Sequence, residues 1–190
     1  MRKVVVNAYV SLDGVVEDPG GAEKFEHGGW HNPYFNGEIQ QFQIDGLFGS
    51  DALLLGRITY QGFADAWPSI TDEQGFADRM NSLPKYVVST TLNKVEWNNS
   101  QLIKGNIAEE VSKLKRKPGQ DILVYGSPRL VQTLMQHNLV DEYSLLVFPV
   151  ILGSGKRLFQ DGSMATLKLV DTKTFSSGVV ALSYQPDRKA

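Results

Sequence analysis

The fold of this chain is decided by one stretch, Leu53-Leu54-Leu55-Gly56-Arg57-Ile58-Thr59-Tyr60-Gln61-Gly62-Phe63. Its apolar run predicts a buried strand, and Gly56 ends that run where a short helix can begin. The first turn of a helix leaves several backbone N–H groups without intrahelical partners, and the helix dipole adds partial positive charge at the same place. A strand that runs into a helix in this way predicts an anion site suited to phosphate.

Two side chains in this stretch strengthen the prediction. Arg57 carries a planar, permanently charged group of donors, and Thr59 can cap the helix or donate its hydroxyl to a phosphate oxygen. The spacing alone is equally typical of a strand, a turn glycine and a capped helix with a surface arginine, because short motifs also occur by chance.

A second stretch repeats this architecture. The apolar run 122–125 is followed at once by Gly126, Ser127 and Pro128, with Ser127 as the predicted helix cap and Pro128 in the first turn. Leu130 then begins an amphipathic helix. Two such sites on one sheet could hold the two ends of a ligand that carries a diphosphate.

Composition limits the classes of protein to consider. The chain has 190 residues, of which 42% are hydrophobic, and this suits one compact domain over residues 1–190. The formal net charge is −2 with both signs interspersed, so we expect no nucleic-acid partner. The densest basic cluster, within 113–117, falls at the end of a predicted helix, where cations suit the dipole.

The chain also lacks the marks of a secreted or membrane protein. There are no cysteines, which excludes disulfides and thiol chemistry and is compatible with a reducing cytosol. The apolar run at 4–6 is too short for a signal peptide, and no stretch approaches the roughly 20 apolar residues of a membrane span. We therefore expect a cytoplasmic protein with no membrane partner.

Apolar runs alternate with amphipathic segments up to residue 137, and a β-rich end follows. A hairpin turn at 176–178 joins the last two strands. This order predicts an α/β fold in three layers: a mostly parallel central sheet, helices on both faces and antiparallel strands at the C-terminal edge. The predicted strands are 3–10, 53–55, 86–88, a short edge strand within 97–103, 122–125, 143–150, 167–175 and 179–184.

Capping residues predict where the helices begin. Asn32 followed by Pro33 is a typical start, and Thr71 with Gln74 forms a capping-box pattern. The predicted caps are Asn32, Thr59, Thr71, Asn106 and Ser127, for helices that end near Gly46 or Gly49, Ala64, Leu83, Pro118 and His137 respectively.

Four other patterns in the sequence give weaker or negative indications of function. The glycine-rich segment 12–33 predicts a flap beside a pocket, because long irregular loops are uncommon unless they are functional. The run Gly153-Ser154-Gly155-Lys156 lacks the Walker spacing. His27 and His31 are four residues apart, but Gly28 and Gly29 between them argue against a helix and there is no acidic third ligand, so we expect no metal site. No serine-hydrolase elbow, Gly-x-Ser-x-Gly, is present.

Taken in order, five short pieces of the sequence resemble the dihydrofolate reductase superfamily. The resemblance is strongest to the branch of the C-terminal reductase domain of the bacterial riboflavin-biosynthesis deaminase/reductase. It covers nearly the whole chain and implies a dihydrofolate reductase-like fold. The pieces are Val10-Ser11-Leu12-Asp13-Gly14, Leu55-Gly56-Arg57-Ile58-Thr59-Tyr60, Val88-Ser89-Thr90, Val124-Tyr125-Gly126-Ser127 and Pro149-Val150-Ile151-Leu152-Gly153-Ser154-Gly155.

The resemblance implies an NADP(H) site. Thr59 would contact the cofactor diphosphate from the helix start, and Arg57 would lie near the adenosine 2′-phosphate. Ser89 and Thr90 would line the adenosine side. The full implied set of cofactor-binding residues is Gly56, Arg57, Thr59, Ser89, Thr90, Gly126, Ser127, Arg129 and Leu130.

The resemblance also implies the reaction. Asp13 would sit near the nicotinamide and the substrate, although Asp13-Gly14 is also an ordinary turn. The substrate's proton could come from Asp13, Glu38 or water. Dihydrofolate reductases carry a carboxylate on the preceding helix near the position of Gln40 here, so folate reduction is disfavoured.

The resulting expectation is an NADPH-dependent reductase that transfers a hydride to a small heterocycle, pterin-like, pyrimidine-like or other. It would resemble 5-amino-6-(5-phosphoribosylamino)uracil reductase and act as a homodimer. The alternative is a non-catalytic module of the same fold that binds NADP(H) or another nucleotide without turnover.

Overall fold

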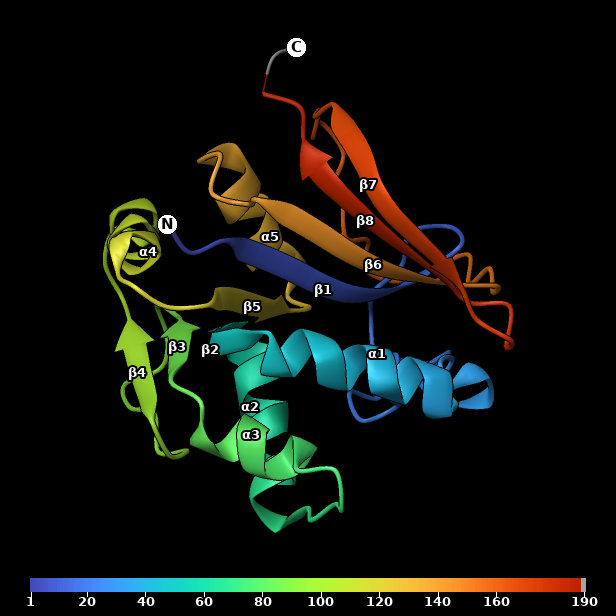
Figure 1. Ribbon diagram of the computed structural model, residues 1–190, viewed down its shortest axis with the longest axis horizontal. Helices are drawn as coiled ribbons and strands as arrows, with labels where there is room; N and C mark the ends of the chain where they lie inside the picture. Colours follow the sequence, from blue (N-terminus) through green and yellow to red (C-terminus); the bar gives the residue numbers. More distant parts are fainter. Residues whose placement is uncertain (189–190) are drawn as a thin grey trace.

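The computed structural model of this chain describes residues 1–188, and its eight strands form one sheet in the order β4-β3-β2-β5-β1-β6-β8-β7 (Figure 1). All neighbours from β4 to β6 are parallel, whereas β8 pairs antiparallel with both β6 and β7. This confirms the predicted fold class. The strands are β1 (Val4–Ser11), β2 (Ser50–Gly56), β3 (Lys85–Val88), β4 (Ser100–Ile103), β5 (Asp121–Tyr125), β6 (Glu142–Phe148), β7 (Leu167–Thr174) and β8 (Val180–Pro186).

Helices cover both faces of the sheet (Figure 1). One face carries α1 (Gly37–Phe48), α2 (Arg57–Ala66) and α3 (Phe76–Ser82), and the other carries α4 (Ile107–Arg116) and α5 (Pro128–Gln136). Two short 3-10 turns, η1 (Asn32–Tyr34) and η2 (Trp67–Ser69), complete the elements. The three predicted layers are therefore present.

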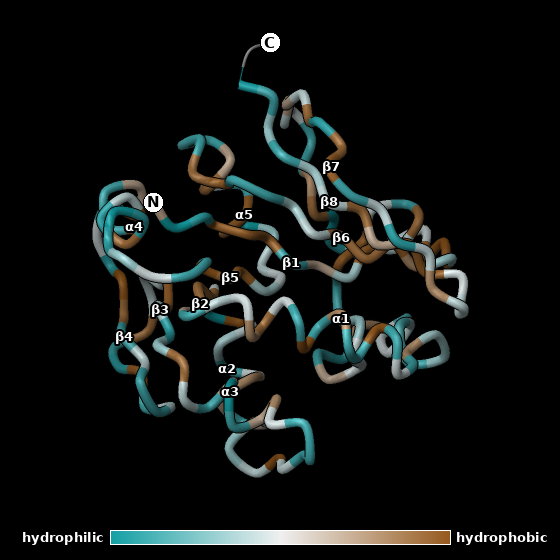
Figure 2. Tube along the Cα trace, in the orientation of Figure 1, coloured by the Kyte–Doolittle hydropathy of each residue, from teal (hydrophilic) through white to brown (hydrophobic). Residues whose placement is uncertain are grey.

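The central strands are apolar throughout because both of their faces are covered. In β2, Ala52 and Leu54 join the cluster under α4 and α5, while Leu53 and Leu55 pack with α1, α2 and α3. None of the four is more than 1% exposed, and full burial of one leucine contributes about 1.5–3 kcal/mol. Brown stretches of β2 and β5 accordingly run through the middle of the molecule in Figure 2.

The start of α1 differs from the prediction. Asn32 and Pro33 form only the turn η1, and Phe35 is extended, with φ −71° and ψ 128°. The helix begins at Gly37, and the side chain of Asn36 caps it by accepting a hydrogen bond from the N–H of Ile39 at 3.1 Å. The predicted cap, Asn32, was wrong because the extended backbone at Phe35 separates it from the helix.

Two further caps were wrong, and one was confirmed. Asp72, not Thr71, organises the start of α3, because its carboxylate accepts hydrogen bonds from three backbone N–H groups at 2.6–2.9 Å. Thr59 is the third residue of α2, whose N-cap is Gly56. Asn106 caps α4 as predicted, by accepting from the N–H of Glu109 at 3.2 Å.

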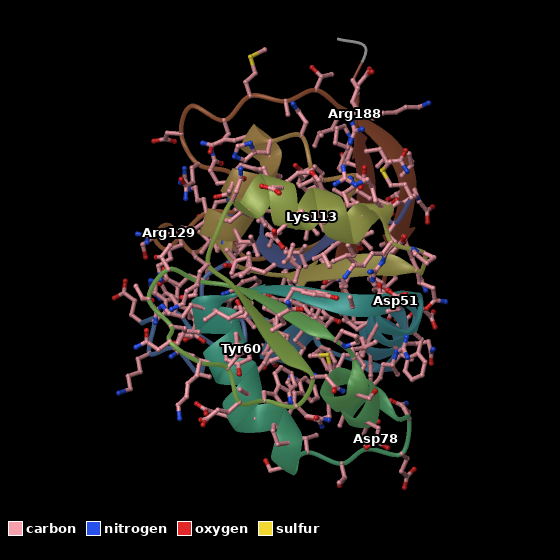
Figure 3. The ribbon with its side chains drawn as sticks, turned by 90° about the vertical axis from the view of Figure 1, so that its left-hand side faces the viewer. Asp51, Tyr60, Asp78, Lys113, Arg129 and Arg188 are labelled. Carbon is pink, nitrogen blue, oxygen red and sulfur yellow. The ribbon has the colours of Figure 1, made fainter. Side chains whose placement is uncertain are left out.

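Ion pairs close the amino end of the sheet. Arg2 contacts Asp51 at the start of β2 and also donates its Nε to the carbonyl of Gln120, before β5, at 2.8 Å. Lys115 of α4 contacts Asp141, which directly precedes β6. Figure 3 shows Asp51 and Arg188 on the opposite side of the molecule from Arg129 of α5. The carboxyl ends of the parallel strands thus lie at the other edge, where parallel sheets generally bind ligands.

Candidate functional site

A cavity of about 730 Å³ lies at the carboxyl ends of β2, β3 and β5. It is bounded by the starts of α2 and α5 and by the loop 156–161 after β6. Most of the predicted cofactor-binding residues line it: Gly56, Arg57, Ser89, Thr90, Ser127, Arg129 and Leu130. These residues come from three separate segments, which follow β2, β3 and β5 at the carboxyl ends of the parallel strands.

Two helix N-termini meet at this cavity. α2 begins directly after Gly56, and α5 begins directly after Ser127, with Pro128 at its first position. Neither first turn contains an acidic residue, so no carboxylate of these turns occupies the free N–H groups. Both helix dipoles place partial positive charge at the cavity.

The two helix starts are in direct contact. A Cβ added to Gly56 would lie 1.9 Å from the Oγ of Ser127 and 2.9 Å from its Cβ. Ser127 itself has a left-handed backbone, φ 61° and ψ 76°, and its side chain makes no capping hydrogen bond. Ser127 thus stands at the predicted N-cap position of α5, although its side chain does not act as the cap.

Thr59 and Gly126 lie behind the cavity wall. Neither is among the lining residues, but a Cβ at Gly126 would be 3.6 Å from the Oγ1 of Thr59. Gly126 has φ +52°. Thr59 thus packs over the glycine that leads into α5, and in this structure it does not reach the cavity directly.

Cations surround the cavity. Arg57 and Arg129 come from the two helix starts, and Lys156 and Arg157 come from the loop after β6, whereas Asp161 is the acidic residue of the lining. Arg57 also donates to Oε1 of Gln61 at 3.0 Å, one turn along α2. This balance of charge suits an anion of more than one negative charge.

On the β3 side, the hydroxyl of Ser89 is already engaged. Its Oγ accepts hydrogen bonds from the N–H groups of Thr91 at 3.2 Å and Leu92 at 3.0 Å. Ser89 is buried, while Thr90 is exposed. The structure thus gives Ser89 the role of shaping the loop and leaves Thr90 exposed at the cavity.

Asp13 ties the loop after β1 to the loop after β6. Its carboxylate accepts from the hydroxyl of Ser11 at 2.7 Å and from the N–H groups of Gly153 at 2.8 Å and Leu152 at 3.1 Å. These hydrogen bonds lower the pKa of Asp13 from 3.8 to about 2, the bond from Ser11 having the largest effect. A carboxylate held this way is a poor proton donor near neutral pH.

Glu17 completes the same connection. It accepts from the backbone N–H of Lys156 at 2.9 Å and from its Nζ at 2.6 Å. A bridge between Val15 and Arg157 runs alongside. The loop that follows β1 thereby positions the two cations Lys156 and Arg157 at the cavity.

Glu38 is not brought to this cavity. It lies in the first turn of α1, exposed to solvent, and accepts from the N–H of Ser176 at 3.0 Å and from the Ser176 hydroxyl. These hydrogen bonds lower the pKa of Glu38. They join α1 to the turn between β7 and β8, which is a structural role.

Lys156, Arg157 and Phe159 also line the cavity but were not predicted from the sequence. The spacing of residues 153–156 does not fit a Walker phosphate loop. That spacing does not indicate where the following residues lie in the fold. In the sequence, Lys156 and Arg157 stand out only as two consecutive basic residues after a glycine-rich turn. Only the contacts with Val15 and Glu17 place them at the cavity.

A second hollow, of about 900 Å³, lies between α2 and the loop 92–98. Its charged residues include Lys94 and Glu96, which pair with each other at 2.6 Å. The hydroxyl of Tyr60 is likewise engaged, by the N–H groups of Glu96 and Trp97. No helix N-terminus points into it, so we place the site at the first cavity.

Within residues 1–188, no three histidine or acidic side chains gather in a way that could hold a metal ion. No helix in the same part of the chain is both long and apolar enough to cross a membrane.

Comparison with known proteins places the chain. Residues 2–181 match the family described as the RibD C-terminal domain. The chain belongs to this family. One relative of the domain, the protein YyaP of Bacillus subtilis (strain 168), is 36% identical over 194 residues, which cover 96% of this chain and 94% of YyaP.

Solved structures agree on the fold of this RibD C-terminal domain. A putative riboflavin biosynthesis protein from Shewanella sp. PV-4 superimposes with a TM-score of 0.76 at 21% identity, covering 98% of this chain and 99% of that one. Dihydrofolate reductase from Enterococcus faecalis, complexed with NADP(H), superimposes with a TM-score of 0.63 at 13% identity, covering 97% and 96%. The family resemblance read from the sequence is confirmed.

The contact between the helix starts predicts a specific pair of variants. Gly56→Ala should lower the free energy of unfolding by about 1–3 kcal/mol, because the added methyl group overlaps Ser127. Adding Ser127→Gly should restore most of this loss, since it removes the overlapping atoms and suits the left-handed backbone. Urea unfolding of the two variants and of Ser127→Gly alone measures the coupling. Equal stability of the single and double Gly56 variants would contradict the contact.

The hydrogen bonds of Asp13 predict a pH dependence. The folded pKa of about 2 lies below the unfolded value of 3.8, so this contribution to stability is complete above pH 3.8 and is lost as the pH falls through 2. Asp13→Asn should therefore be less stable than wild type at pH 6 but about equal to it near pH 2. Urea unfolding at pH 6, 4, 3 and 2 measures the difference, with the exposed Asp65→Asn as control. A difference that is constant with pH would rule out this assignment.

Proposed function

We propose that this RibD C-terminal domain protein is an NADPH-dependent reductase that transfers a hydride to a small heterocyclic substrate. The observation that carries the proposal is the meeting of two helix N-termini, with three arginines, at one cavity. That arrangement suits a diphosphate flanked by a further phosphate. The family and the fold support the same conclusion.

The residues present fit NADP(H). The backbone N–H groups at the starts of α2 and α5 would hold the diphosphate, because Gly56 allows the two starts to approach each other. Arg57 would pair with the 2′-phosphate, and Thr90 would line the adenosine side. Arg129 and Arg157 would add positive charge, and Leu130 would supply an apolar wall. When bound, the nicotinamide supplies the hydride, and the protein supplies orientation.

The proton that the substrate takes up needs a source other than Asp13 or Glu38. Asp13 and Glu38 both accept hydrogen bonds in their charged forms, and their pKa values are lowered. We therefore assign Asp13 to positioning the loop that carries Lys156 and Arg157, and Glu38 to anchoring α1. Water is then the proton source that fits best.

The competing function is a non-catalytic module that binds NADP(H). It is favoured by Gln40, half-buried on α1, because the family resemblance puts the carboxylate of dihydrofolate reductases near this position. NADPH oxidation measured by absorbance across a panel of pterins, pyrimidines and other heterocycles distinguishes the two, because the module would bind NADPH without oxidising it.

We also propose a homodimer formed through β7. This strand is at the edge of the sheet, and its Leu169 and Val170 are 47% and 44% exposed. A long edge strand with exposed apolar side chains is a ready site for pairing with another chain. The other edge strand, β4, is half as long, with four residues against eight.

The cofactor assignment predicts a change of preference. Arg57→Gln should weaken NADPH binding about five- to fifty-fold, as expected for the loss of a charged hydrogen bond to phosphate, and should leave NADH binding within about two-fold. Isothermal titration calorimetry with each cofactor measures both. Arg116→Gln, at the exposed end of α4, is the matched control and should change neither. Binding of neither cofactor by the wild type would refute the proposed function.

The dimer assignment predicts the effect of a charge on the edge strand. Val170→Lys should halve the mass measured by light scattering during size-exclusion chromatography, because a charged side chain opposes strand pairing. Gln101→Lys on the opposite edge should leave the mass unchanged. A monomeric wild-type protein would refute the proposed assembly.

A further inference from the structure

Arg57 occupies an unfavourable position for a cation. It is the first residue of α2, where the helix dipole places partial positive charge, and basic side chains are generally favoured at the opposite end of a helix. α4 follows the ordinary pattern, with Glu109 and Glu110 in its first turn and its basic residues in the last turn. The position of Arg57 therefore does not serve the stability of α2, and it is better explained by a role at the cavity that Arg57 lines.

The guanidinium of Arg57 has a neutral partner. Its Nη1 donates a hydrogen bond to Oε1 of Gln61 at 3.0 Å. The two residues are four apart on α2, a spacing that brings side chains together on one face of a helix. No carboxylate within residues 1–188 forms an ion pair with this guanidinium. Gln61 thus fixes one donor of the group and leaves its positive charge uncompensated.

The other cations of the cavity are held differently. Lys156 pairs with the carboxylate of Glu17 at 2.6 Å, which compensates its charge. The side chains of Arg129 and Arg157 have no hydrogen-bond or ion-pair partner in the part of the chain that the structure describes. Among the described lining residues, Arg57 is therefore the arginine that another side chain orients without pairing its charge.

A guanidinium held in this way suits a phosphate group. It carries five N–H donors in a planar fork, and the bond to Gln61 occupies one of them, which leaves enough for a bidentate contact with phosphate oxygens. Because the side chain is oriented before a ligand arrives, binding costs less conformational entropy. A carboxylate at position 61 would also orient Arg57, but it would compete with the phosphate for the guanidinium and repel it.

Gln61 itself does not line this cavity. It lines the second hollow instead, together with Ala64 and Asp65 of the same helix. The side chain of Gln61 is exposed to solvent, so its replacement leaves the core intact. Any effect of Gln61 on a ligand in the cavity must therefore act through Arg57.

We propose that Gln61 is a positioning residue that holds the guanidinium of Arg57 toward the 2′-phosphate of NADP(H) and so sets the preference for NADP(H) over NAD(H). This inference rests on the proposed reductase function and deepens it. Two properties of the glutamine act together. Its amide oxygen orients Arg57, and its neutrality leaves the charge of Arg57 available to the phosphate.

The test measures NADPH and NADH binding to the full chain by isothermal titration calorimetry. Gln61→Leu removes the acceptor, and Gln61→Glu keeps an acceptor but adds a negative charge. The double variant Arg57→Gln with Gln61→Leu shows whether Gln61 acts through Arg57. Gln41→Leu is the matched control, because Gln41 is an exposed glutamine of α1 that bonds to Asp45, also four residues away, at 2.8 Å.

NADPH binding should weaken about two- to five-fold in Gln61→Leu, the effect of one exposed hydrogen bond. It should weaken about three- to ten-fold in Gln61→Glu, because the carboxylate pairs with Arg57 and repels the phosphate. NADH binding should stay within about two-fold of the wild type in both variants. In the double variant the loss should equal that of Arg57→Gln alone, and Gln41→Leu should change neither affinity.

The melting temperature separates this role from a merely structural one. Gln61→Glu should melt no lower than the wild type, because its carboxylate can still pair with Arg57, although its NADPH affinity falls. A residue that only stabilised α2 would be replaced by glutamate without loss of NADPH binding.

Three results would overturn the proposal: unchanged NADPH affinity in either Gln61 variant, equal weakening of NADPH and NADH, or a further loss when Gln61→Leu is added to Arg57→Gln. Each leaves the reductase function standing, since the wild type still binds NADPH. Binding of neither cofactor by the wild type would refute the proposed function and this inference with it.

Discussion

The contact between Gly56 and Ser127 is the constraint on which the site depends. β2 and β5 are neighbours in the sheet, and each is followed at once by a helix. The two helices can begin side by side only because Gly56 has no side chain where Ser127 lies. Ser127, the residue in contact with Gly56, has a left-handed backbone at the point where α5 begins. Both helix N-termini thereby face one cavity, and both dipoles place partial positive charge there.

The amino and carboxyl ends of the parallel strands carry different arrangements of charge. At the amino end, Arg2 with Asp51 and Lys115 with Asp141 pair their charges. At the carboxyl end, the cations of the cavity outnumber its acids. At this end the loop after β1 has a structural role, since Asp13 and Glu17 hold the loop after β6 in place. The charge that would bind a phosphate is thus positioned by carboxylates outside the cavity.

Sequence patterns predicted the parts of the site that depend on local order. Strand, glycine and helix start follow one another within a few residues at Gly56 and at Gly126, so their arrangement is nearly independent of the rest of the chain. The predictions were wrong where a distant residue, or a neighbouring residue that competes for the same hydrogen bonds, determines the local structure. Gly56 takes the N-cap position expected for Thr59, and Asp72 replaces Thr71 because a carboxylate can accept several N–H groups at once. Glu38 lies in the first turn of α1, but its carboxylate accepts a hydrogen bond from the backbone N–H of Ser176, which is far away in the sequence.

By itself, the sequence determined the α/β class through its periodicity. The family and the two places where a strand, a glycine and a helix start follow one another came from short runs of adjacent residues. Only the tertiary structure decided which residues share the cavity and which do not. It brought Lys156 and Arg157 to the site through contacts with Glu17 and Val15. These pairings join segments far apart in the sequence, and their geometry is set by strand order and helix packing, which no local pattern encodes.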